Sequence, residues 1–401
     1  MRAYSTSSEE ALRTRSMLKD WSSEGFLTEA QYQLMERETV CELRRTNIFL
    51  RLVLFLFTLI IVGAAIALFF AGIVTRPEMQ TAGIFLLIFA AVSYAAAELA
   101  VSQARLYRYG IEEALAACSV GLLCVGMYAI WFSGRPYLQA ERMEFPIPAA
   151  GAILSLWIWH RFGFPYAFLA AMICVCWMPG YWTSSHAAQH LTVAAFYAAG
   201  LIIVAALRFR QRFTYLNDVY SIAEALLWGG IYLAINLQLS SINWLGRWWL
   251  GPQSTAQFSR PFYWTTFVLT WCLPPAVLAR GLFRKDRLVI AVGAVVAVLT
   301  LATNKPYLGL PRQTWDPMLL GALLIGAGFS IRRWLAAGPG GIRHGFTAQR
   351  LSRKDKSWMS AGATAVGFVA PQSITPGPQT SSPDVHFGGG DSGGAGASSD
   401  F

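Results

Sequence analysis

The sequence predicts an all-α fold, a polytopic bundle of about ten transmembrane helices whose N- and C-termini both lie in the cytoplasm. Of the 401 residues, 55% are hydrophobic and 13% are charged, which is too apolar for a domain with a fully wetted surface. The apolar residues come in blocks of roughly 20, the length that a helix needs to cross a hydrocarbon core of about 30 Å. The alternating segments of a transmembrane β-barrel are missing, so that class is excluded.

Residues 1–47 form a polar lead-in that we expect to be a cytoplasmic helical hairpin. Ser7 and Glu10 have the spacing of a capping box, and Gly25 suits the end of a helix. Thr28 and Gln31 repeat the capping pattern where a second helix would begin. The apolar residues of this segment would close a small hydrophobic contact or dock on a partner, and they are Leu12, Leu18, Trp21, Phe26 and Leu34.

Ten apolar segments follow within residues 48–335, the predicted transmembrane domain. The expected spans are Leu52–Val74, Ala82–Val101, Ala114–Phe132, Phe145–His160, Phe164–Trp182, Leu191–Leu207, Tyr220–Leu237, Phe262–Leu282, Leu288–Thr303 and Met318–Trp334. Only three residues separate the fourth span from the fifth, so the stretch Phe145–Trp182 could form a re-entrant hairpin instead. Either form returns the chain to the same side of the membrane.

The basic residues set the orientation. With alternate loops on opposite sides, 25 of the 32 Lys and Arg fall on the side of the N-terminus and 7 on the other side. Positive residues mark the cytoplasmic side of a membrane protein. The formal net charge of +10 then reflects basic loops lying against anionic lipid head groups. The expected partner is therefore the lipid bilayer, and not a nucleic acid.

Two segments outside the spans have a distinctive composition. Residues 336–401 are rich in Gly, Ser and Pro, a composition that buries too little apolar surface to fold, and we expect a disordered cytoplasmic tail. The loop from Gln238 to Pro261 would lie along the outer membrane interface, or alternatively act as an aromatic lid over a ligand. Both interpretations rest on its cluster of Trp244, Arg247, Trp248 and Trp249.

Ionisable residues inside a membrane are costly and therefore mark candidate sites. We single out Glu98, Glu113 and Glu224 as candidate buried carboxylates, with Glu112 beside them. All four lie near the cytoplasmic ends of their helices, where they could snorkel or pair with arginines. The arginines considered are Arg105, Arg108, Arg208 and Arg212. The alternative is a carboxylate cluster that binds a cation or a proton between helices.

Two short segments of the chain resemble each other. Tyr109–Leu115 and Tyr220–Leu226 match at five of seven positions, and the matches include Glu113 and Glu224. Both segments open a helix that runs outward, as in a parallel repeat. Chance similarity in an Ala- and Leu-rich sequence is the other explanation.

The sequence predicts no catalytic residue, no cofactor site and no metal site. His186 and His190 share one helix face, but no carboxylate or Cys completes a ligand set. The six Cys have no paired spacing and are interpreted as small hydrophobic residues, and hydrolase motifs are missing. Pro274 and Pro275, in the eighth span, predict a kink or a break, and a kink that serves packing is favoured.

The N-terminal region resembles a known family. The pattern of Leu18, Trp21, Gly25, Thr28 and Gln31, leading through a charged helix into apolar spans, is similar to a bacterial family of multipass inner-membrane proteins. This is the domain-of-unknown-function family twenty-one fifty-seven, and the resemblance covers roughly the first 130 residues. It implies a location in the bacterial plasma (inner) membrane and no particular activity.

These observations lead to three hypotheses about function. The first is a permease-like carrier of a small solute. The second is a membrane-embedded sensor or scaffold that acts through the N-terminal hairpin on a cytoplasmic protein partner. The third is an enzyme of lipid or envelope metabolism.

Overall fold

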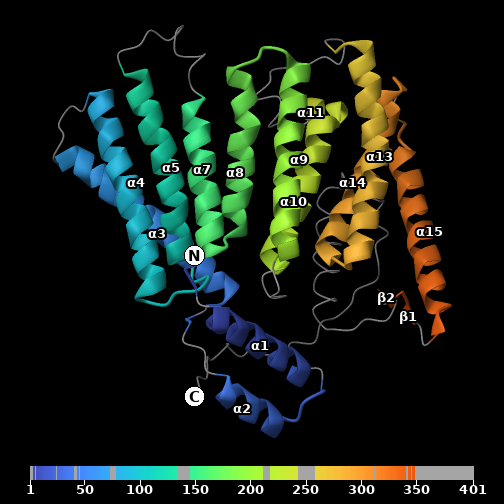
Figure 1. The fold of residues 1–401 in the computed structure, drawn as a ribbon, viewed down its shortest axis with the longest axis horizontal. Coiled ribbons are helices and arrows are strands. Elements are labelled where there is room, and N and C mark those ends of the chain that lie inside the picture. Colours follow the sequence, from blue (N-terminus) through green and yellow to red (C-terminus); the bar gives the residue numbers. More distant parts are fainter. Residues whose placement is uncertain are drawn as a thin grey trace, which may run out of the picture.

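The computed structural model describes residues 3–4, 6–23, 25–39, 43–44, 46–72, 78–133, 145–210, 217–242, 258–310, 313–339, 342–344 and 346–347. Its long helices stand side by side, and two shorter helices lie beneath one end of them (Figure 1). We call this end of the bundle the hairpin end and the opposite one the far end.

The two shorter helices are α1 (Thr6–Ser23) and α2 (Glu29–Glu38). The bundle contains α3 (Ile48–Gly72), α4 (Met79–Ser102), α5 (Ile111–Phe132), α7 (Pro146–Phe162), α8 (Pro165–Trp177) with its 3-10 extension η1 (Met178–Tyr181), α9 (His186–Arg210), α10 (Asn217–Ile235), α11 (Leu237–Ile242), α13 (Arg260–Arg284), α14 (Arg287–Tyr307) and α15 (Asp316–Ala336). Two short strands, β1 (Ile342–Arg343) and β2 (Phe346–Thr347), pair in antiparallel register after α15.

A helix coincides with each of the ten expected spans, and the predicted helical character of the chain is confirmed. Within the described residues, seven helices are long and apolar enough to cross a membrane: α3, α4, α5, α9, α13, α14 and α15. The segments Pro165–Tyr181 and Val219–Ile235 are shorter apolar helices. Helix α7 has 17 residues and so a length of about 25 Å. The count of ten spans, the re-entrant alternative and the orientation remain predictions.

The helices of the hairpin begin and end close to the capping residues that the sequence predicts. Helix α1 begins at Thr6, one residue before the expected cap, and Gly25 has the φ of +81° that suits a glycine after a helix. The predicted capping box of α2 is present, because Gln31 N donates to Thr28 Oγ1 and Thr28 N donates to Gln31 Oε1 at 3.0 Å. These contacts satisfy backbone donors that the first turn of a helix leaves without partners.

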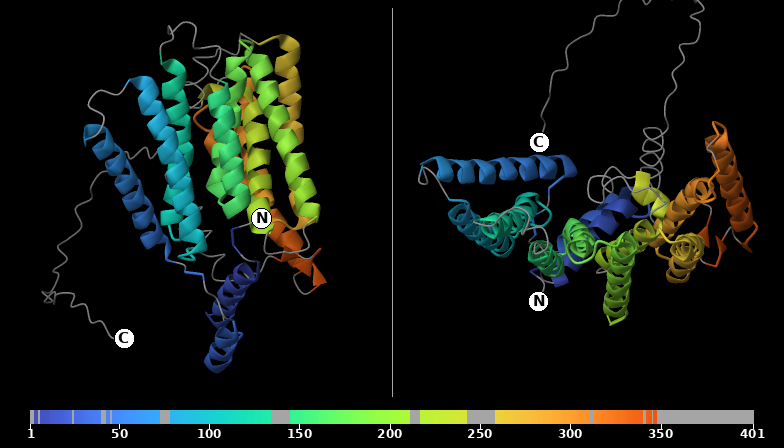
Figure 2. Two further views of the ribbon diagram at one scale, coloured as in Figure 1. Left: turned by 60° about the vertical axis from the view of Figure 1, so that its left-hand side comes forward. Right: turned by 90° about the horizontal axis from the view of Figure 1, so that it is seen from above.

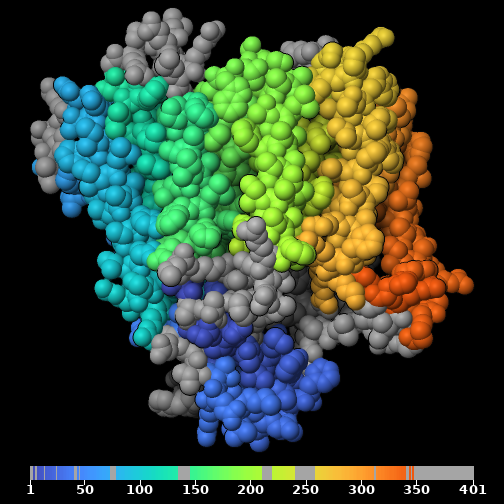
Figure 3. Space-filling model, in the orientation of Figure 1, coloured from blue at the N-terminus to red at the C-terminus, as the bar shows by residue number. Residues whose placement is uncertain are grey.

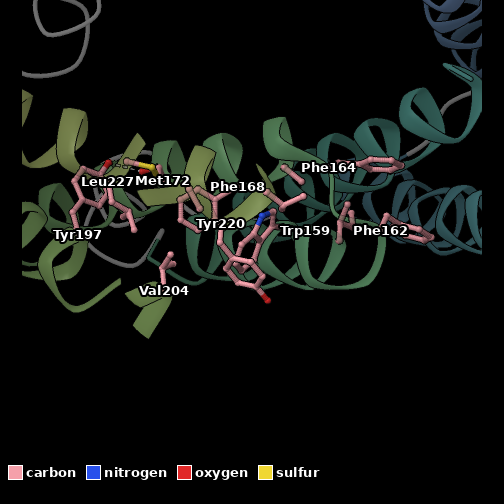
Figure 4. Packing of buried hydrophobic residues seen from close by; sticks show 14 of the residues in the cluster. Trp159, Phe162, Phe164, Phe168, Met172, Tyr197, Val204, Tyr220 and Leu227 are labelled. Atoms are coloured by element: carbon pink, nitrogen blue, oxygen red, sulfur yellow. Dashed lines mark hydrogen bonds between the residues drawn. The ribbon is translucent and has the colours of Figure 1, made fainter. Parts of the chain in front are cut away.

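A hydrophobic core lies mainly among α7, α8, α9 and α10 (Figure 4). The Trp159 ring contacts Phe168 at 4.9 Å and Tyr220 at 5.4 Å, in edge-on or tilted geometry that aromatic pairs prefer. Tyr197 donates its hydroxyl to Met172 O at 2.8 Å, so this buried polar group is satisfied. Aromatic packing therefore fixes the middle of the bundle.

Helices α3 and α15 lie at opposite ends of the elongated array (Figure 2). In α3 the one buried residue is Thr58, and α15 has none. Their large apolar side chains are exposed, for example Leu68 at 75% and Ile325 at 76%. Such surfaces are costly in water but are expected where lipid tails replace water.

Helix α13 continues through Pro274 and Pro275 without a break. A proline leaves the carbonyl four residues earlier without its helical donor, and for Pro274 that carbonyl belongs to Thr270. Thr300 of α14 donates its hydroxyl to Thr270 O at 3.3 Å. The single proton of this hydroxyl is shared between Thr270 O and the nearer Val296 O of its own helix, at 2.9 Å. Helix α13 is continuous, so the alternative of a broken helix is wrong.

Two earlier predictions fall largely outside the described residues. The tryptophan cluster of the loop after Gln238 lies there, and so does the chain beyond Thr347. Within the expected tail, Arg343 places its guanidinium 4.7 Å from the Trp334 ring, and His344 stacks on the same ring at 6.2 Å. These contacts hold β1 and β2 against the end of α15.

Candidate functional site: buried carboxylates at the hairpin end

Glu224 of α10 is fully buried, forms ion pairs with three arginines and accepts hydrogen bonds from two of them. Arg208 of α9 donates from Nη1 at 2.7 Å, and Arg280 of α13 donates from Nε at 3.0 Å. Arg284 lies farther away, with Nη1 at 3.7 Å. Because one carboxylate faces three guanidinium groups, the charge of Glu224 is more than neutralised. The predicted pairing of Glu224 with Arg208 is confirmed.

Asp286, in the turn between α13 and α14, belongs to the same network. Its Oδ2 accepts from Arg208 Nη2 at 2.8 Å, and Ser221 Oγ donates to the carboxylate at 2.7 Å. Asp286 also caps α14 by accepting from Leu288 N at 3.1 Å. Burial alone would raise the pKa of Asp286, but the hydrogen bonds from Ser221 and Arg208 outweigh burial and hold this pKa below its usual value.

Glu113 of α5 pairs with Arg51 of α3 through two hydrogen bonds, one of them from Arg51 Nε at 2.7 Å. Gly110 brings the two helices together, because its φ of +107° and its lack of a side chain let the start of α5 contact the Arg51 carbonyl. A Cβ at Gly110 would collide with that oxygen. The backbone approach therefore places Arg51 beside Glu113.

Glu98 of α4 pairs with Arg161 at the end of α7, and Arg161 Nε donates at 3.0 Å. The Glu98 side chain keeps 28% of its surface exposed, so this pair is the most open of the three. The sequence suggested Arg105, Arg108, Arg208 and Arg212 as partners of the four carboxylates, without assigning particular pairs. The actual partners of Glu98 and Glu113, Arg161 and Arg51, come from other helices, and sequence spacing gave no sign of them.

Glu112 differs from Glu113 and Glu224 because half of its carboxylate has no hydrogen-bond partner in the described part of the chain, a feature that it shares with Glu98. Oε1 accepts from Tyr109 N at 2.6 Å, while Oε2 is buried without a hydrogen bond. The hydroxyl oxygens of Tyr4 and Tyr166 are also buried without a hydrogen bond there. Burial first, and then the negative charges of Glu112 and Glu113, raise the pKa of Tyr4.

The structure does not join the carboxylates into one cation site. Glu98, Glu113 and Glu224 each pair with different arginines. The Arg51–Glu113 and Arg161–Glu98 pairs link helices about 60 residues apart, and the Arg208–Glu224 pair links the consecutive helices α9 and α10, which is a structural role for ion pairs of this kind. Glu113 and Glu224, the matching members of the similar segments, are both buried and both paired with arginine.

At the far end, polar side chains of α10, of α14 and of Asn236, the residue after α10, form a hydrogen-bonded network. Asn236 Nδ2 donates to Tyr232 Oη at 2.8 Å and to Thr303 Oγ1 at 3.0 Å, and Tyr232 also bonds Thr300 at 2.9 Å. The sequence gives no signal for this group, because single uncharged polar residues in apolar segments are common. These bonds hold the two helices together.

His190, at the start of α9, contacts the carbonyl of Ala234 through Nδ1 at 2.7 Å. His186 contacts Gln189 Oε1 through Nδ1 at 3.3 Å. Among the described residues, no group of three or more His, Cys, Asp or Glu side chains could hold a metal ion. The imidazoles therefore have structural contacts at the far end.

Comparisons with family models, curated proteins and solved structures find no match to this chain.

Proposed function

We propose that the chain is a multipass protein of the bacterial inner membrane that acts as a scaffold or sensor through its cytoplasmic hairpin α1–α2. One observation carries the proposal. The hairpin is fastened to the bundle at both of its ends, while its outer surface exposes large apolar side chains.

Backbone hydrogen bonds and one buried ring fasten the hairpin. Ala3 N donates to Arg161 O at 2.9 Å, and Tyr107 N donates to Arg44 O at 3.0 Å. Tyr4 is 5% exposed, belongs to the main core and packs edge-on against Tyr107 at 4.9 Å between ring centres. A force on the hairpin therefore acts directly on the hairpin ends of α5 and α7.

The outer surface of the hairpin suits a protein partner. Leu18 is 4% exposed, whereas Trp21, Phe26 and Leu34 are 44%, 74% and 63% exposed. Helix α2 lies farther from the bundle than α1, so it lies beyond the membrane that would surround the bundle (Figure 3). Exposed aromatic and aliphatic side chains of this kind are typical anchors of protein interfaces.

The test is crosslinking of the full-length protein in its native membrane, followed by identification of the crosslinked proteins. Phe26→Ser and Leu34→Ser should each remove a specific partner that the wild type captures. Ala30→Ser, at an exposed position of the same hairpin, should keep that partner. An identical partner list for all three variants would contradict the proposal.

A second candidate, a permease-like carrier of a small solute, is supported by the buried oxygens of Glu112, Tyr4 and Tyr166 that lack hydrogen bonds among the described residues. They could bind a cationic group or a proton. Arg51 neutralises the charge of Glu113, so a substitution of Glu112 tests this site better than a substitution of Glu113. Glu112→Gln should abolish a solute-dependent growth phenotype while insertion is kept, and Glu98→Gln should not. Full retention in Glu112→Gln would exclude this carrier site.

A further inference from the structure

A groove of about 360 Å³ lies between α9, α10 and α13, and its lining is charged at one end and apolar along the rest. Glu224 and Arg280 line one part, and the rest is lined by Leu201, Ile202, Ala205, Trp228 and Ala276. Trp228 follows Glu224 by one helical turn toward the far end, and Ala276 precedes Arg280 by one turn. The charged part therefore faces the hairpin end, and the apolar part extends into the bundle.

The charged part carries an excess of positive charge. The network contains three arginines, Arg208, Arg280 and Arg284, and two carboxylates, Glu224 and Asp286. Arg280 and Arg284 keep 36% and 27% of their side chains exposed, while Glu224 is fully covered. An anion that approaches from outside thus meets guanidinium groups before it meets a carboxylate.

A second observation comes from the apolar part. The indole nitrogen of Trp228 is buried and has no hydrogen-bond partner in the described part of the chain. A buried N–H without an acceptor is costly, and tryptophan donors at membrane interfaces commonly serve lipid carbonyl oxygens. Trp228 lies one turn deeper than Glu224, the carboxylate that contacts the arginines, as an ester carbonyl lies deeper than the phosphate of the same lipid.

We propose that this groove binds one anionic phospholipid. Its phosphate lies against Arg280 and Arg284, an ester carbonyl accepts from Trp228 Nε1, and an acyl chain runs between Leu201 and Ala276. Basic pockets between helices at the cytoplasmic side of a membrane protein are suited to anionic head groups. The occupant is a lipid and not free phosphate, because most of the lining is apolar.

The test uses the purified full-length protein in an uncharged detergent. Phosphatidylglycerol, phosphatidylcholine or inorganic phosphate is added, and retained lipid is counted by native mass spectrometry while the melting temperature is recorded. Phosphatidylglycerol should be retained and should raise the melting temperature, and the other two should not. Equal effects of phosphatidylcholine would overturn the role of the arginines, and equal effects of inorganic phosphate would overturn the role of the apolar groove.

Three variants locate the binding. Ala276→Trp fills the groove from an exposed position without changing charge, and Arg284→Gln removes one cation that contacts Glu224 only at long range. Each should lower phosphatidylglycerol retention at least fivefold. Arg332→Gln makes the same charge change on exposed α15 and should leave retention unchanged. Retention in Ala276→Trp and Arg284→Gln equal to that of Arg332→Gln would refute the site.

Discussion

Arg208 of α9 and Asp286, the residue before α14, form a 2.8 Å ion pair across 78 positions of sequence. The second terminal nitrogen of Arg208 contacts Glu224 of α10 at 2.7 Å. One guanidinium group therefore joins three parts of the bundle at the hairpin end. Its fixed planar geometry allows it to hold both carboxylates at once, which a lysine could not do.

The Asp286 carboxylate should make stability depend on pH at the acid end. Its pKa in the folded protein lies below the usual value of 3.8, so its stabilising contacts are fully present above that value and are lost as the pH falls through the lowered pKa. In the Asp286→Asn variant, the melting temperature measured in detergent should fall less steeply as the pH is lowered through this range. An equally steep fall in wild type and variant would show that other groups cause it.

Removal of the buried Glu224 charge should lower the stability of the fold strongly. Glu224→Gln leaves three arginines at a covered position without their shared carboxylate, and removal of one partner of a buried pair costs about 3 kcal/mol. Glu98→Gln, at a pair with 28% of the glutamate exposed, should cost less than about 1 kcal/mol. Thermal unfolding of both variants measures the difference, and equal losses would contradict the ranking.

Gly110 should tolerate no side chain. Gly110→Ala forces a residue with a Cβ into a φ of +107° and against the Arg51 carbonyl, and the strain alone costs about 2 kcal/mol. Gly121→Ala, on the same helix but with open space around it, should lose nothing. If both variants melt at the wild-type temperature, the close approach of α3 and α5 is not needed for stability.

Thr300 and Pro274 should be energetically coupled. Thr300→Val removes the donor to Thr270 O and should cost about 1 kcal/mol. Pro274→Ala restores a backbone N–H for the same carbonyl, so the loss from Thr300→Val should shrink in that background. Thr192→Val, whose hydroxyl bonds the Ala188 carbonyl of its own helix, serves as the uncoupled control. Additive losses would show that Thr300 does not replace the missing donor.

The threading of ten spans makes a prediction about topology. Alkaline phosphatase fused after Ser185 or Gln253 should be active, and fusions after Arg108 or Lys356 should be inactive, because phosphatase folds only outside the cytoplasm. Green fluorescent protein at the same positions should give the reverse pattern. Phosphatase activity after Arg108 would invalidate the assigned orientation.

The sequence by itself determined the helices and most of their ends. Apolar blocks about as long as a bilayer is thick leave few structures other than helices, because backbone groups in lipid must bond within their own segment. Local signals such as the Thr28 and Gln31 box also appear in the structure, because both partners lie on one turn. Glu113 and Glu224 could be found as buried carboxylates because charge in an apolar segment is rare.

Only the tertiary structure decided which groups meet. Arg51 reaches Glu113 because Gly110 lets α3 and α5 touch, and Asp286 reaches Arg208 because α9 and α14 both pack near α10. Helix packing sets such contacts through the shapes of whole faces, and no spacing along the chain encodes them. The groove beside Glu224 and the partly satisfied carboxylate of Glu112 arise in the same way, because packing decides which surfaces are filled and which stay open.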